Sequence, residues 1–155
     1  QSEMNRRRFE RQLLALCAAR TDLALVHADA LASVQWHDPA CAAVSASMLD
    51  TLADDPAVSP AAIVGAASMA EPRAAGFLTR GVPESAVPED LAAFLVEELS
   101  IGDAEEAVAA MRAQMSAPGS MSAEDYELMF QTVAAMQRQL TARKRAHAES
   151  AASSR

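Results

Sequence analysis

The segment from Ser122 to Arg145 constrains the fold of this chain more than any other part of it. It contains no Gly or Pro, and its large apolar residues are spaced so that they fall in one stripe along an α-helix. These residues are Tyr126, Met129, Phe130, Val133, Met136 and Leu140. The segment ends on Arg143-Lys144-Arg145, and cations are favourable at a helix C-terminus. We therefore predict a long amphipathic helix.

A second long helix is predicted just upstream, over the stretch from Pro88 to Met115. Gly102 is the weak point of this stretch, because Gly costs about 1 kcal/mol relative to Ala inside a helix. The helix is either continuous through Gly102 or divided there by a kink, and we expect continuity because the apolar pattern resumes afterwards. The break Ala117-Pro118-Gly119 then predicts a short turn. Two long helices joined by a short turn form a helical hairpin.

Shorter helices are predicted nearer the N-terminus. Asp38-Pro39 and Ser59-Pro60 each combine a capping side chain with a proline in the first helical turn. The missing N–H of proline costs nothing at that position. Thr21 or Asp22 is expected to cap a further helix that continues to Leu31.

The whole chain is predicted to be all-α, because no segment alternates with the period of a strand. An apolar fraction of 51% with only 4% aromatic residues suits a helical core of Ala, Leu, Val and Met. Pro72 is expected to start a short helix. We predict a bundle of about six helices over residues 1–100, the end of the connecting helix plus the hairpin over 101–147, and a frayed tail over 148–155. Because the first residue is Gln1, we also expect a fragment of a longer protein.

Charge is distributed unevenly along the chain. The formal net charge is -8, and residues 21–70 contain six acidic residues but no Lys or Arg, whereas residues 1–20 and 137–155 are net basic. An acidic body repels a phosphate backbone, so we expect it to bind no nucleic acid directly. No stretch approaches the ~20 apolar residues that span a bilayer, and no signal peptide is recognised. We therefore expect no membrane partner and a cytoplasmic location.

Few residues in the sequence suggest chemistry. The histidines His27, His37 and His147 are far apart and not at ligand spacing from a cysteine, whereas a zinc site needs about four clustered ligands. Cys17 and Cys41 lie among small apolar residues and are expected to be buried and unpaired. There is no phosphate-binding glycine loop and no nucleophile elbow. We expect no metal, no cofactor and no catalytic residue, so the fragment is not expected to be an enzyme by itself.

The methionines are concentrated near the C-terminus, where five of the eight follow residue 110. Met adapts to irregular apolar surfaces, so this stripe is either the packing seam of the hairpin or a surface that meets another protein. Trp36 likewise either closes one end of the helical core or anchors a partner. A two-helix hairpin has little interior, so part of its apolar surface is expected to meet the bundle or a partner.

Several short motifs, taken in order, resemble the helicase-interacting C-terminal domain of bacterial DNA primase. The opening Phe9-Glu10-Arg11-Gln12-Leu13-Leu14-Ala15-Leu16 contains the Glu-x-x-Leu-Leu run of that family, and Thr21-Asp22-Leu23-Ala24 is similar to its next element. Trp36-His37-Asp38-Pro39-Ala40, Leu91-Ala92-Ala93-Phe94-Leu95 and the helix from Asp125-Tyr126 to Leu140 follow in the same order. The resemblance extends over residues 4–147. The N-terminal domain of the replicative helicase is the main confusable relative.

The resemblance implies a bundle that modulates the hexameric replicative DNA helicase and a hairpin that binds the helicase N-terminal domain. This domain would recruit primase, a nucleotidyltransferase whose zinc-binding and RNA-polymerising domains would lie upstream, to the replication fork. The partner-binding positions carried over are Met115, Met121, Tyr126, Met129, Phe130, Val133, Met136 and Leu140. Two other classes remain as alternatives: a helical adaptor with another protein client, and a small all-α enzyme or ligand-binding domain, for which the sequence supplies no obvious pocket lining.

Overall fold

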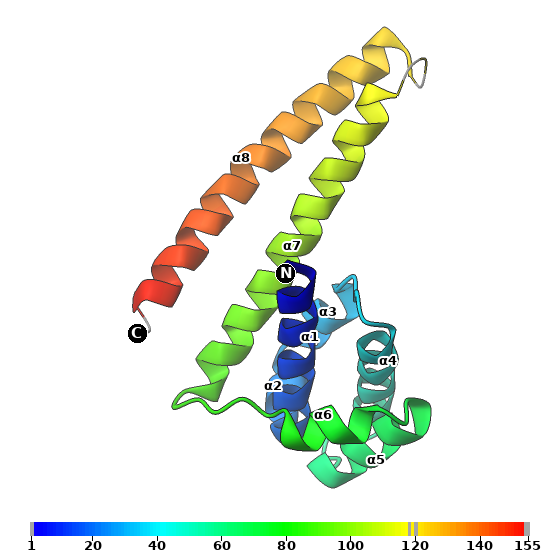
Figure 1. The fold of residues 1–155 in the computed structure, drawn as a ribbon, viewed down its shortest axis with the longest axis vertical. Coiled ribbons are helices and arrows are strands. Elements are labelled where there is room, and N and C mark those ends of the chain that lie inside the picture. Colours follow the sequence, from blue (N-terminus) through cyan, green and yellow to red (C-terminus); the bar gives the residue numbers. More distant parts are fainter. Residues whose placement is uncertain (1, 118, 120, 154–155) are drawn as a thin grey trace. The chain divides into compact units, whose positions relative to one another are not determined.

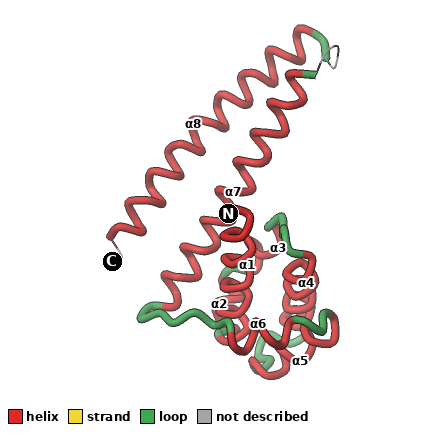
Figure 2. Tube along the Cα trace, in the orientation of Figure 1, coloured by secondary structure: helices red, strands yellow, loops and turns green. Residues whose placement is uncertain are grey.

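The computed structural model describes residues 2–117, 119 and 121–153. Within these residues every regular element is a helix (Figure 2), so the predicted all-α class is confirmed. The helices are α1 (Ser2–Ala19), α2 (Thr21–Val26), α3 (Ala28–Ser33), α4 (Pro39–Asp54), α5 (Pro60–Ala70), α6 (Ala74–Arg80), α7 (Pro88–Ser116) and α8 (Ala123–Ser153).

The chain divides into two compact units, Gln1–Leu99 and Ser100–Arg155, which we call the bundle and the hairpin. The boundary falls inside α7, so this helix contributes its first part to the bundle and its second part to the hairpin (Figure 1). The predicted continuity of the helix through Gly102 is confirmed.

The core of the bundle consists of small and aliphatic side chains from α1 to α7. In α1 every residue from Leu13 to Ala18 is buried, because this helix packs against α2, α4, α5 and α6. Leu95 and Leu99 of α7 belong to the same core cluster. Trp36 is partly buried and packs against this cluster, as expected of a residue that closes one end of a helical core.

Two predicted helix starts are confirmed in atomic detail. Asp38 caps α4 by accepting a hydrogen bond from the Ala40 N–H at 2.9 Å, and Ser59 caps α5 by accepting from the Ala62 N–H at 3.2 Å. In both helices proline occupies the first turn. The side chains satisfy N–H groups that have no partner inside the helix.

Two other predicted starts are wrong. The helix over 21–31 is divided at His27 into α2 and α3, and neither Thr21 nor Asp22 caps it. The Asp22 carboxylate instead accepts two hydrogen bonds from the Arg20 guanidinium, at 2.9 and 2.8 Å. The short helix predicted from Pro72 is present as α6, but it begins at Ala74. Pro72 lies in a turn ahead of it, where the Glu71 carboxylate accepts a hydrogen bond from the Arg73 N–H.

The predicted frayed tail over 148–155 is also corrected, because α8 continues to Ser153. This segment contains Ala148, Ala151 and Ala152, and Ala has the highest helix propensity of all residues. Residues 154–155 and Pro118 of the predicted turn lie outside the described residues. Gly119 within that turn has a positive φ of 68°, a conformation that Gly adopts without steric cost.

Candidate docking surface of the hairpin

An apolar seam joins the two helices of the hairpin, which lie side by side (Figure 1). Ile101 and Val108 of α7 and Val133 and Leu140 of α8 are its buried residues. Partly buried side chains pack against them, namely Ala104, Met111, Met115, Met129 and Met136. Five predicted partner-binding residues therefore pack within the seam: Met115, Met129, Val133, Met136 and Leu140.

Polar contacts bridge the helices of the hairpin along this seam. The Arg112 guanidinium donates to the Gln137 side-chain oxygen at 3.1 Å, and the Lys144 ammonium lies 3.4 Å from the Glu105 carboxylate. Arg143 donates to the Ser100 hydroxyl at 2.9 Å. Two of the three cations in Arg143-Lys144-Arg145 thus form contacts within the hairpin.

Three large apolar side chains of α8 remain outside the seam. Tyr126 is 44% exposed, Phe130 53% and Leu128 67%. Tyr126 and Phe130 are four residues apart and so lie on the same flank of the helix. Leu128 lies two residues from each of them, a rotation of about 200°, and therefore points away from that flank. Met121, in the turn before α8, is half-buried.

The start of α8 holds this flank in place. Ser122 accepts a hydrogen bond from the Asp125 N–H at 3.1 Å, and its carbonyl accepts from the Tyr126 N–H at 2.9 Å. Glu124 and Asp125 occupy the first turn, where negative charge is favourable to the helix dipole. The aromatic pair therefore stands on a capped, regular helix close to the turn.

The bundle contains a buried polar network that we did not predict. The Glu10 carboxylate, fully buried, accepts hydrogen bonds from Arg6 Nε at 2.8 Å, the His37 N–H at 2.8 Å and the Asp38 N–H at 3.0 Å. Arg6 also donates to the carbonyls of Gln35 and Leu99. Buried charges of this kind are tolerated because they are paired and hydrogen-bonded.

A sequence signal for this network did exist. Arg6 and Glu10 precede Leu13 and Cys17 at helical steps of four, three and four, which places both charges on the buried face of α1. The network fixes the loop before α4 against α1. Its role is structural, because its donors and acceptors are occupied by one another.

Asp38 connects the buried network to Arg11, which is half-exposed. Burial raises the pKa of the Asp38 carboxyl, but the hydrogen bond from the Ala40 N–H and the contact with Arg11 outweigh burial, so that its pKa is lowered overall. Arg11 Nη2 lies 2.9 Å from the Asp38 carboxylate. The carboxylate therefore serves as a helix cap and an ion-pair partner together.

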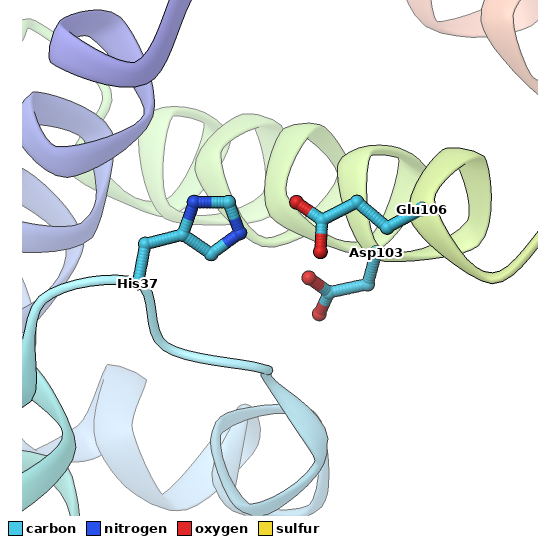
Figure 3. Close-up of side chains that lie close together, drawn as sticks. All are labelled: His37, Asp103 and Glu106. Atoms are coloured by element: carbon cyan, nitrogen blue, oxygen red, sulfur yellow. The ribbon is translucent and has the colours of Figure 1, made fainter. Parts of the chain in front are cut away.

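Figure 3 shows His37, from the loop before α4, together with Asp103 and Glu106 from successive turns of α7. His37 belongs to the bundle, whereas Asp103 and Glu106 belong to the hairpin. We therefore assign no ligand set to the three side chains. The expectation that the chain needs no metal remains a prediction.

Cys17 and Cys41 are both free and buried, as predicted. Burial raises the pKa of each thiol to about 12. The thiolate is the reactive form of cysteine, so these side chains act as small apolar groups of the core.

Comparison with known proteins assigns no family to this chain, since no family model, no curated protein and no solved structure matches it. Among the described residues, no helix combines the length and the apolar character that crossing a membrane requires. The resemblance to the primase domain therefore stays a prediction that rests on the motifs alone.

Proposed function

We propose that this chain is a protein-docking domain of a bacterial primase, which binds the N-terminal domain of the hexameric replicative helicase through the hairpin. The observation that carries the proposal is the exposure of Tyr126 and Phe130 beside a seam whose central residues are buried. Large aromatic side chains in such positions are the residues that most often dominate the free energy of protein binding.

The architecture gives this proposal further support. A helical bundle followed by a hairpin on a shared long helix is the arrangement that the resemblance implies. The seam residues stabilise the hairpin internally, so they would support the docking surface without forming it. Of the eight predicted partner-binding residues, we retain Tyr126 and Phe130 as contacts and Met121 as a neighbour in the turn.

The bundle is proposed to modulate the helicase once the hairpin is bound. Its acidic residues disfavour direct contact with nucleic acid, so the chain would act on the replication fork through protein contacts. It would recruit the polymerising domains of primase to the helicase and tune helicase and priming activity.

Calorimetric titration of the chain against the cognate helicase N-terminal domain tests the proposal. We expect a dissociation constant of about 1 µM or tighter. Changing Tyr126 and Phe130 together to Ala should abolish binding while the helical circular dichroism signal is retained, because both side chains are exposed.

Single-stranded DNA serves as the second titrant. Absence of binding to the helicase domain would contradict the proposal, as would tight, salt-sensitive binding to DNA alone. Such DNA binding would instead indicate that the chain binds nucleic acid through the basic end of α8.

A further inference from the structure

Two of the three polar bridges along the hairpin are seven residues apart on each helix, and a further step of seven on α8 leads to Phe130. Gln137 and Lys144 are seven residues apart on α8, and their partners Arg112 and Glu105 are seven apart on α7. Seven residues are close to two helical turns, so such positions lie on the same side of a helix. The next position towards the turn on α8 is Phe130.

The seven-residue spacing supplies no position on α7 opposite Phe130. The corresponding step from Arg112 leads past the end of α7, at Ser116, to Gly119 in the turn. A Cβ placed on Gly119 would have no atom within 4 Å, so there is open space at this position. At this position of α8 there is thus an aromatic ring that is 53% exposed.

The charge around this ring has one sign. No Lys or Arg occurs from Ala113 to Gln137, whereas Glu124, Asp125 and Glu127 all lie in this stretch. All three carboxylates are exposed, and within the described part of the chain none of them forms a salt bridge. The end of the hairpin near the turn is therefore apolar on one flank and acidic around it.

We propose that the Tyr126–Phe130 flank enters an apolar cleft of the partner protein whose rim carries Lys or Arg. This inference rests on the proposed function, because it describes the surface that the helicase domain would present. Glu127 is the rim contact, since it lies three residues before Phe130 and next to Tyr126 in the sequence. Opposite charges at a rim accelerate association, whereas the buried aromatic residue slows dissociation.

Two copies of this chain are not expected to pair through this flank alone. Each would present the exposed carboxylates of Glu124, Asp125 and Glu127 there, and these like charges would repel each other. The charges of this flank favour a partner with a basic surface instead.

Matched variants of the full chain test the assignment, with binding to the helicase N-terminal domain followed by surface plasmon resonance. Phe130→Ala should weaken affinity by at least about tenfold, mainly through faster dissociation. Leu128→Ala is the control, because it removes an exposed side chain of the same helix that points away from the flank. It should change affinity by less than about twofold.

Charge reversal tests the basic rim. Glu127→Lys should slow association severalfold at low salt and reduce the dependence of the association rate on salt. The control is Glu149→Lys, which makes the same change on an exposed residue near the other end of α8 and should leave the rate unchanged.

The possible results separate the two proposals. An effect of Leu128→Ala equal to that of Phe130→Ala would overturn the choice of flank, and faster association of Glu127→Lys would overturn the basic rim. In both cases the proposed function would survive. If the unaltered chain does not bind the helicase domain, the proposed function fails and this inference fails with it.

Discussion

Arg6 and Glu10 form an ion pair across one turn of α1, with Arg6 Nε 2.8 Å from Glu10 Oε2 and both side chains buried. Glu10 also accepts the N–H groups of His37 and Asp38, so one carboxylate connects α1 to the start of α4. Removing Arg6 would take this cation away from the buried Glu10 carboxylate, and removing Glu10 would take this carboxylate away from Arg6.

Glu10→Ala is therefore expected to destabilise the bundle by about 3–5 kcal/mol, because the Arg6 guanidinium loses the Glu10 carboxylate and two backbone N–H groups lose an acceptor. Urea unfolding followed by circular dichroism measures the change. The control is Asp50→Ala on exposed α4 surface, which should alter stability by about 0.5 kcal/mol or less. Equal effects of the two substitutions would show that the network contributes little.

The Asp38 carboxyl has a lowered pKa in the folded state, so its ionised form stabilises the fold. This contribution is present above the usual value of 3.8 and is lost as the pH falls through the lower folded-state pKa. We expect the unaltered chain to be more stable than Asp38→Asn near neutral pH and the difference to shrink in acid. Urea midpoints measured for both proteins over this pH range provide the test. A difference that does not vary with pH would refute the assignment.

Amide hydrogen exchange is expected to be faster in residues 117–145 than in residues 9–52. Among the described residues, four are buried in the hairpin seam, whereas the bundle core is a larger cluster built from α1 to α7. Segments with few buried apolar contacts open at lower free energy. Uniform protection across both regions, measured by mass spectrometry, would argue against this expectation.

Leu140→Ala separates the seam from the docking surface. Because Leu140 is buried, its truncation should destabilise the hairpin by about 2–5 kcal/mol and accelerate exchange throughout α8. Leu128→Ala, at an exposed position of the same helix, should leave exchange unchanged. Similar exchange in the two variants would show that the seam does not hold the hairpin together.

The thiols of Cys17 and Cys41 should resist a thiol-specific reagent at mildly alkaline pH, since both are buried and their pKa is about 12. Both should react fully after denaturation. Rapid labelling of the native chain, followed by absorbance, would indicate that the core opens readily.

Local features of the sequence predicted the elements that depend on neighbours in the chain. The starts of α4 and α5 were predicted from Asp38-Pro39 and Ser59-Pro60, because a cap and a first-turn proline act within a few residues. The same reasoning failed at Asp22, whose carboxylate is engaged by Arg20. Arg20 also contacts Glu89 at 2.7 Å, a partner far away in the sequence.

For the candidate docking surface, too, some features follow from the local sequence and others from tertiary packing. Periodicity alone determined that α8 is a long helix with an apolar stripe, because the repeat of 3.6 residues per turn is a property of the local backbone. Tertiary packing decided which part of that stripe is internal: α7 covers Val133 and Leu140 but leaves Tyr126 and Phe130 exposed. It also decided that Glu10 is buried, since its partners come from a loop distant in the sequence. The helical period determines which residues of α8 share a face. The packing of α7 against α8 determines which of these faces is exposed to water.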